Sequence, residues 1–251
     1  MRRIAIMLLG IIAFATMAEA QVRSEQLLER GWRFTRDDSP TFSLVECDDS
    51  AWQQVTIPHD WAIYGPFSIN NDRQNVAITQ DGQKEAMEHA GRTGGLPFVG
   101  VGWYRLKFDI ASLEDNRVTL IFDGAMSHAR VYVNGHEAGY WPYGYNSFHL
   151  DVTPYVNEGS NQLAVRLENK PESSRWYPGA GLYRNVHLVV TNDVHIPVWG
   201  TQITTPEVTK DYAKVVMRTE ISLPEGAEAK HCKLVTDILN AEGVVVASSE
   251  D

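Results

Sequence analysis

Cysteine, clustered positive charge and helical periodicity are all scarce in this sequence. Only Cys47 and Cys232 occur among 251 residues. Two isolated cysteines exclude a cysteine-rich zinc site, and their places in different expected domains argue against a disulfide between them. Lys and Arg number 22 against 32 Asp and Glu, which gives a formal net charge of −10. Because Lys and Arg form no cluster that could displace counterions, neither nucleic acid nor anionic lipid is an expected partner.

Long apolar runs are also lacking, except at the N-terminus. Arg2 and Arg3 precede an apolar run from Ile4 to Met17, and Ala18-Glu19-Ala20 ends it with small residues. This layout is typical of a secretory signal peptide that is cleaved before Gln21, with a buried N-terminal helix as the alternative. The run is shorter than the about 20 residues that a membrane-spanning helix needs. We therefore expect residues 1–20 to be a signal peptide and the mature protein to be periplasmic or secreted, without membrane association.

Alternation with a period of two dominates after residue 30. In residues 162–168, for example, Leu163, Val165 and Leu167 share one face, as in a half-buried antiparallel strand. Asn134-Gly135 is a strong hairpin signal because both residues tolerate a positive φ. Further strands are predicted at residues 102–110, 117–123, 128–133, 136–140, 147–152 and 185–190. The pattern predicts an all-β jelly-roll β-sandwich over residues 22–192.

Two stretches depart from this rhythm. Residues 70–102 form a long, glycine-rich connection, for which we predict a helical turn near residues 83–89; such loops are usually functional, and a disordered excursion is the alternative. Beyond a boundary near Pro197, strands are predicted at residues 201–205, 213–223, 233–239 and 244–247. An immunoglobulin-like sandwich needs about seven strands. We therefore expect residues 193–251 to be a truncated immunoglobulin-like sandwich, and the chain to be a fragment or a shortened gene model.

Several segments, taken in order and spacing, carry a family resemblance. They read GWRF at 31–34, VTIPHDW at 55–61, GWYR at 102–105, VYVNG at 131–135, FHLDVTPY at 148–155 and SRWYPGAGLYR at 174–184. Together they resemble the N-terminal sugar-binding domain of family 2 glycoside hydrolases of the β-galactosidase type, over residues 30–191. The resemblance continues more weakly into the immunoglobulin-like domain that follows in that family. It implies hydrolysis of terminal β-galactosides with retention, and no cofactor is expected.

Retaining hydrolysis needs two carboxyl groups about 5–5.5 Å apart. The family places both on a (β/α)₈ barrel of about 250 residues, and no part of this sequence has that pattern. Glu158 follows an asparagine, as the family's acid/base does, but a glutamate in an exposed turn lacks the burial that raises an acid's pKa. The acidic residues Glu46, Asp48 and Asp49 are interpreted as a solvated turn. We therefore expect no catalytic residue in this chain and a missing C-terminal barrel as its partner.

The residues expected to contact the carbohydrate substrate are Arg175, Trp176, Tyr177 and Gly100. Aromatic faces pack against sugar C–H groups, and charged groups bond sugar hydroxyls. The resemblance places the first three near the galactose pocket, although some relatives have an aspartate near Arg175; packing of the two aromatics against the barrel is the alternative. Gly100 belongs to a glycine-rich segment that the family directs toward the active-site mouth. This segment opens a strand, which excludes a dinucleotide loop.

The remaining large aromatics are interpreted as core because they lie on alternating strands. They are Trp61, Trp103, Tyr104, Phe122 and Tyr132. His59 is interpreted as a structural histidine with its hydrogen bonds satisfied. Two other functions remain open, a stand-alone carbohydrate-binding module and a protein-binding adhesion sandwich. The preference for galactosides over glucuronides or mannosides rests on the resemblance alone.

Overall fold

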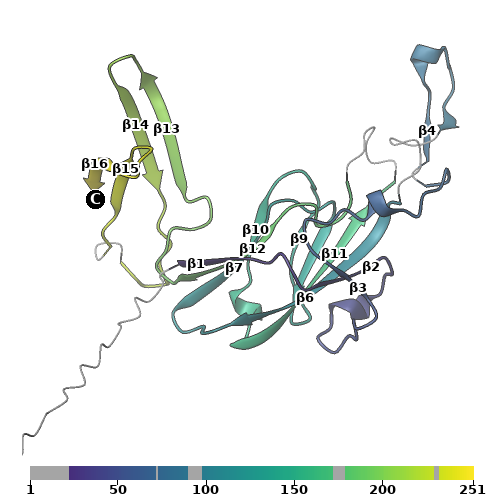
Figure 1. Cartoon of the computed structure of the whole chain (residues 1–251), viewed down its shortest axis with the longest axis horizontal. Helices are drawn as coiled ribbons and strands as arrows, with labels where there is room; N and C mark the ends of the chain where they lie inside the picture. The colour runs from purple at the N-terminus through teal and green to yellow at the C-terminus, as the bar shows by residue number, and fades with distance from the viewer. Residues whose placement is uncertain (1–22, 72, 90–97, 172–178, 229–231) are drawn as a thin grey trace, which may run out of the picture.

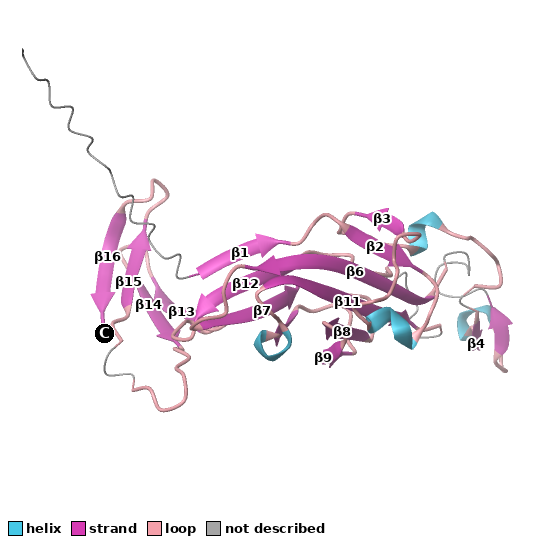
Figure 2. Ribbon diagram, turned by 90° about the horizontal axis from the view of Figure 1, so that it is seen from below, coloured by secondary structure: helices cyan, strands magenta, loops and turns pink. Residues whose placement is uncertain are grey.

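The computed structural model describes residues 23–71, 73–89, 98–171, 179–228 and 232–251. Within these ranges the regular elements are strands and short 3₁₀ helices, and two sheets face each other as a sandwich (Figures 1 and 2). The all-β expectation is confirmed. No described helix is long and apolar enough to cross a membrane.

The strands and 3₁₀ helices have the following bounds: β1 (Arg23–Leu27), β2 (Trp32–Thr35), η1 (Pro40–Ser43), β3 (Gln53–Val55), η2 (Ala62–Tyr64), β4 (Gln74–Val76), η3 (Thr79–Asp81), β5 (Met87–His89), β6 (Gly100–Ile110), β7 (Asn116–Phe122), β8 (Ala129–Val133), β9 (His136–Trp141), β10 (Phe148–Asp151), η4 (Thr153–Tyr155), β11 (Gly159–Asn169), β12 (Val186–Asn192), β13 (Thr201–Val208), β14 (Ala213–Thr219), β15 (Val235–Leu239) and β16 (Val245–Glu250). One sheet has the order β1-β12-β7-β10 and the other the order β3-β2-β6-β11-β8-β9.

The core lies between the two sheets and follows the alternation in the sequence. Leu163, Val165 and Leu167 of β11 are fully buried, and Val118, Leu120 and Phe122 of β7 are buried opposite them. Within the four-stranded sheet, Phe122 of β7 stacks on its cross-strand neighbour Phe148 of β10, with ring centroids 4.8 Å apart. Such interdigitating inner faces are what holds a sandwich together, because each strand removes every second side chain from water.

Strand β6 is buried on both faces, which single-sided alternation does not predict. Trp103 and Arg105 point away from the core, yet each is only 1% exposed, because the segment around η1 covers them. The Arg105 guanidinium lies 2.8 Å from an Asp49 carboxylate oxygen and donates to the carbonyls of Phe42 and Leu44. A buried cation is tolerated only when it is paired and hydrogen-bonded in this way.

Two predictions of local structure were wrong. The sequence interpretation placed no strand before the GWRF segment at 31–34, but β1 precedes it and pairs with β12 in antiparallel register, Arg23 opposite Thr191. Its residues are polar and mostly exposed, so an edge strand of this kind has no alternation to reveal it. Near residues 83–89, Met87–His89 forms strand β5 and pairs with β4. The 3₁₀ turn η3 lies earlier, where Gly82 adopts the left-handed conformation that ends it.

The long connection therefore carries its own small hairpin, β4-β5, which projects from one end of the sandwich (Figure 1). Arg73 and Glu88 join its two strands through an ion pair of 2.8 Å. At its root, Tyr64, Phe67 and Ile69 are between 60% and 73% exposed. The connection is thus an extended arm with an apolar root, in the part of the chain that the structure describes.

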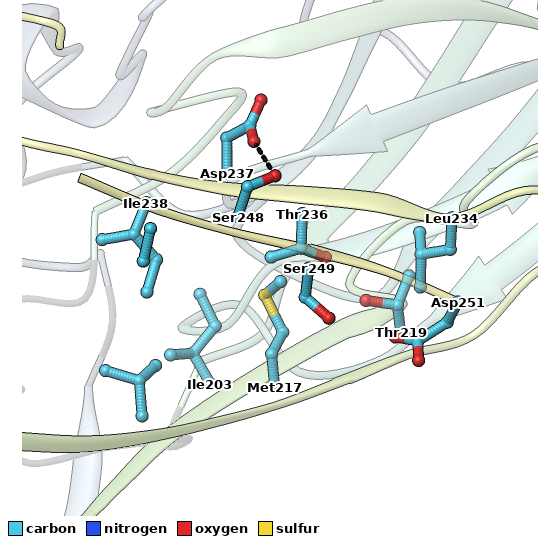
Figure 3. Close-up of a pocket in the computed structure, with 12 residues that line it drawn as sticks. Ile203, Met217, Thr219, Leu234, Thr236, Asp237, Ile238, Ser248, Ser249 and Asp251 are labelled. Carbon is cyan, nitrogen blue, oxygen red and sulfur yellow. Dashed lines mark hydrogen bonds between the residues drawn. The ribbon is translucent and has the colours of Figure 1, made fainter. Parts of the chain in front are cut away.

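The C-terminal region consists of two hairpins, β13-β14 and β15-β16, beside the opposite end of the sandwich (Figures 1 and 2). Their apolar faces line a cleft of about 500 Å³ (Figure 3). Ile203 and Met217 lie on one side of the cleft and Ile238 on the other, while the Asp237 carboxylate accepts a bond from Ser248. Ile203 is still 63% exposed, so the four described strands pack only loosely. The extent of the domains stays a prediction.

Candidate functional site

One edge of the sandwich brings together described residues that flank two of the segments considered functional from the sequence. Gly100, at the start of β6, lies opposite Asn169, at the end of β11. Asn169 is buried and its side-chain amide donates to the Gly179 carbonyl at 2.9 Å. Gly100, Asn169 and Gly179 therefore meet at this edge, because the start of β6 lies beside the end of the antiparallel strand β11.

The four expected substrate-contacting residues are only partly placed by the structure. Gly100 lies at the edge just described and has a φ of +122°, a conformation that L side chains rarely adopt. A Cβ at this position would meet the Phe98 ring at 3.3 Å. Arg175, Trp176 and Tyr177 lie outside the described residues. Their role in binding substrate stays a prediction.

An aromatic cluster underlies this edge and fixes its shape. The Phe34 ring packs on Trp61 and Tyr104, with centroids 5.5 and 4.8 Å away. Two glycines leave room for the cluster. A Cβ on Gly102 would lie 2.6 Å from the Trp61 ring, and one on Gly181 would overlap the His59 carbonyl and lie 2.5 Å from the Tyr104 hydroxyl. Neither position can hold a side chain without moving a buried ring.

His59 is the polar centre of the cluster. Its Nδ1 lies 2.7 Å from the Tyr104 hydroxyl, and the residue is 9% exposed. Burial lowers the pKa of His59 below its ordinary value of 6.5, and the nearby Asp60 carboxylate opposes part of that effect. Burial raises the pKa of Tyr104 well above its ordinary value. Both groups are therefore neutral near pH 7, and the geometry agrees with the interpretation of His59 as a satisfied structural residue.

Backbone bonds tie the segment 59–62 to the segment 180–182. The His59 amide donates to the Leu182 carbonyl at 2.7 Å, and the Trp61 amide donates to the Ala180 carbonyl at 3.0 Å. The Asp60 carboxylate accepts from the amides of Ala62 and Ala180. The carboxylate thus holds two chain segments together, which suits positioning of a loop rather than chemistry on a substrate.

Three of the four acidic candidates from the sequence have structural roles. Glu158 lies in an exposed turn, where its carboxylate accepts from the Leu113 amide at 2.9 Å. Asp48 accepts from the Ser50 amide, whereas Asp49 binds buried Arg105. Asp49 is therefore not a merely solvated residue of a turn, as the sequence interpretation had it. Its partner, Arg105, is 56 residues away in the chain, so spacing could not reveal the pair.

The predicted core aromatics are buried with one exception. Trp61, Trp103, Tyr104 and Phe122 are at most 2% exposed. Tyr132 is only half-buried, because it stacks on Trp103 on the outer face of its sheet. Both cysteines are free. Within the described ranges, no group of three His, Cys, Asp or Glu side chains is placed to hold a metal ion.

Sequence reasoning overlooked a pair of exposed tyrosines on the loop between β9 and β10. Tyr143 and Tyr145 are 56% and 40% exposed, with ring centroids 5.5 Å apart. The two tyrosines that flank Gly144 in the sequence were the signal from which this exposed pair could have been predicted.

Comparison with known proteins identifies the family that the sandwich matches. Residues 26–192 match the family model described as "Glycosyl hydrolases family 2, sugar binding domain". A putative β-glucuronidase of Formosa agariphila is 34% identical over 99% of this chain and 22% of its own length. A β-galactosidase of Bacteroides ovatus is 34% identical over 96% of this chain and 26% of its own length.

A solved structure agrees with the sequence comparisons. A glycosyl hydrolase family 2 member from Bacteroides cellulosilyticus superimposes with a TM-score of 0.77 and 33% identity, over 90% of this chain and 28% of the other. The chain thus spans about a quarter of the length of these relatives.

Proposed function

From the premise that the chain belongs to family 2 of the glycoside hydrolases, we propose that it supplies the N-terminal, sugar-binding part of an exported enzyme. The observation that carries this is the match of the sandwich, residues 26–192, to the family's sugar-binding domain. In this proposal the sandwich supports a catalytic domain outside residues 1–251. The edge at Gly100 and Asn169 contributes to the mouth of the substrate site.

The reaction we propose for the whole enzyme is hydrolysis of terminal β-galactosides with retention. Retention requires a nucleophilic carboxylate and an acid/base carboxyl group about 5–5.5 Å apart. The carboxylates weighed as candidates in the sequence, Glu158 and Asp49, are engaged in structural bonds. This supports a chain that shapes the site without performing the chemistry.

The choice of galactosides over glucuronides rests on the motif resemblance, since relatives named for either activity are 34% identical to the chain. Comparing turnover of p-nitrophenyl β-galactoside and p-nitrophenyl β-glucuronide by the product of the complete gene tests the choice. Faster turnover of the glucuronide would overturn the galactoside assignment and leave the family role intact.

The accessory role is tested on the chain itself. We expect residues 21–251 to show no hydrolysis of either p-nitrophenyl glycoside above the uncatalysed rate. Glu158→Gln is the decisive variant, with Glu46→Gln as the matched control in another acidic turn. Turnover by the chain that disappears in Glu158→Gln alone would contradict the proposal.

A stand-alone carbohydrate-binding module is the second candidate, favoured by the sugar-binding description of the matched family model. It predicts sugar binding by residues 21–251 and no coding sequence for a barrel beyond codon 251. Sequencing of the gene past that codon separates it from the first candidate.

A further inference from the structure

The exposed tyrosines of the β9–β10 loop form a rigid surface. The Tyr183 hydroxyl donates to the Gly144 carbonyl at 2.6 Å, and the Trp141 indole nitrogen donates to the Asn146 side chain at 3.0 Å. A Cβ on Gly144 would overlap the sulfur of Met126, so the loop packs closely on the segment beneath it. Tyr143 and Tyr145, on either side of this glycine, are therefore held in place while their rings face solvent.

Hydrogen-bonding groups surround the two rings. The Tyr183 hydroxyl and the Arg184 side chain lie together beside Gly124, where an added Cβ would meet each of them at 2.8 Å. Arg184 is exposed and donates to the Asp123 carbonyl at 3.4 Å. The Tyr183 hydroxyl thus lies at the backbone between the two exposed rings, with the Arg184 side chain beside it. Sugar-binding sites combine an aromatic face, which packs on the C–H side of a pyranose, with hydrogen-bond donors to its hydroxyl groups.

The surface is also continuous with the substrate edge described above. Met126, which packs against Gly144, exchanges two backbone hydrogen bonds with Gly181, at 2.9 and 3.0 Å. Gly181 lies two residues after Gly179, the residue that Asn169 holds at that edge. One short path of packed residues therefore connects the tyrosine pair to the proposed substrate mouth.

We propose that Tyr143 and Tyr145 form a sugar-binding platform that takes one pyranose ring of an oligosaccharide, with Arg184 donating to the hydroxyl or carboxylate groups of that sugar. The proposal rests on the proposed function for the class of ligand. The rings are set at 59° to each other, so one of them stacks on the pyranose and the other flanks its edge. The platform would hold a sugar residue beyond the one that is cleaved.

Titration calorimetry on residues 21–251 tests the platform, with β-1,4-galactotetraose, methyl β-galactoside and methyl β-glucuronide as probes. We expect measurable binding of the tetrasaccharide and a loss of about tenfold or more in affinity in Tyr143→Ala/Tyr145→Ala. Tyr212→Ala removes an equally exposed tyrosine, 55%, from the C-terminal hairpins and serves as the control. Absence of binding to the unaltered chain, or equal affinity in the double variant, would overturn the proposal.

Conservative variants separate stacking from a change in the fold. Tyr143→Phe keeps the aromatic face and should bind within about threefold of the unaltered chain, whereas Tyr143→Leu keeps apolar bulk without a π face and should bind more weakly. Equal binding by both variants would refute the stacking role. If the guanidinium faces the ligand, Arg184→Gln should weaken the binding of methyl β-glucuronide more than that of methyl β-galactoside. Unchanged affinity for both sugars would show that Arg184 does not contact the ligand. None of these results depends on hydrolysis, so they are read separately from the assay of the enzyme.

Discussion

At the scale of single residues, the 2.7 Å hydrogen bond between His59 and Tyr104 joins two buried polar groups from distant segments of the chain. His59 was correctly interpreted as structural, but its partner, Tyr104, lies 45 residues away in the chain, and no spacing rule joins them. The burial of Arg105 was hidden for a similar reason. A segment distant in sequence covers the outer face of β6, so alternation alone underestimates the burial of that face.

The His59–Tyr104 pair predicts a pH dependence of stability. Because burial lowers the pKa of His59 in the folded chain, the unfolded chain binds a proton more readily. The stabilisation is complete above the ordinary value of about 6.5 and is lost as the pH falls toward the lower folded value. We expect the free energy of unfolding to decrease between pH 7.5 and 5.5, measured by urea denaturation.

His59→Asn, whose amide can replace Nδ1, should reduce that slope, whereas His136→Asn at an exposed position should keep it. An unchanged slope in His59→Asn would show that other groups control the dependence.

At the scale of elements, strands with one buried face were predictable to within a few residues, since β7, β10 and β12 bury every second side chain or nearly so. Strand β1 was not predicted, because its exposed, polar sequence shows no alternation of apolar and polar residues. The hairpin between β8 and β9 was the clearest prediction, and it is confirmed. Asn134 and Gly135 have φ values of 51° and 84°, as a tight turn of this kind requires.

Asn134 does more than turn the chain, and this leads to a prediction. Its side chain donates to the Tyr155 carbonyl and accepts from the Gln162 amide, at 2.8 and 2.9 Å. We expect Asn134→Ala to destabilise the chain by about 3 kcal/mol, from lost hydrogen bonds and a left-handed backbone. Asn134→Gly loses the same bonds without the backbone strain.

Thermal or urea unfolding of both variants measures the difference in stability. We expect Asn134→Ala to lower the free energy of unfolding by about 1 kcal/mol more than Asn134→Gly does. An equal loss of stability in the two variants would show that the positive φ at position 134 does not destabilise the alanine variant.

At the scale of the whole molecule, the chain combines a well-packed sandwich with a loosely packed pair of hairpins. The sandwich core has fully buried residues on both sheets, whereas Val215 and Ile238 in the hairpins stay 44% and 40% exposed. Strands were predicted in both regions, because short runs rich in β-branched residues indicate strands even where their hairpins pack loosely. Sequence reasoning could not place the β4-β5 arm, since three-residue strands are too short to show a period.

Export is the prediction that belongs to this scale. If Ala18-Glu19-Ala20 is a cleavage site, the protein recovered from the periplasm or medium should begin at Gln21. Intact-mass spectrometry of the exported protein measures this directly. Ala20→Leu places a larger residue before the cleavage position and should leave the precursor uncut, with Ala13→Leu in the apolar run as the control. Recovery of the full-length chain from the cytoplasm alone would contradict export.

The pairing of β1 with β12 has a consequence for how the chain acquires its fold. Arg23 pairs with Thr191, and Leu27 pairs with His187. The first strand to be synthesised is therefore among the last to form its backbone hydrogen bonds. Contacts between such distant residues slow folding, because a long loop must close before any of them forms. A nascent chain that stopped before Val186 would expose the flank of β7 where β12 belongs, and would be open to pairing with other chains until synthesis resumed.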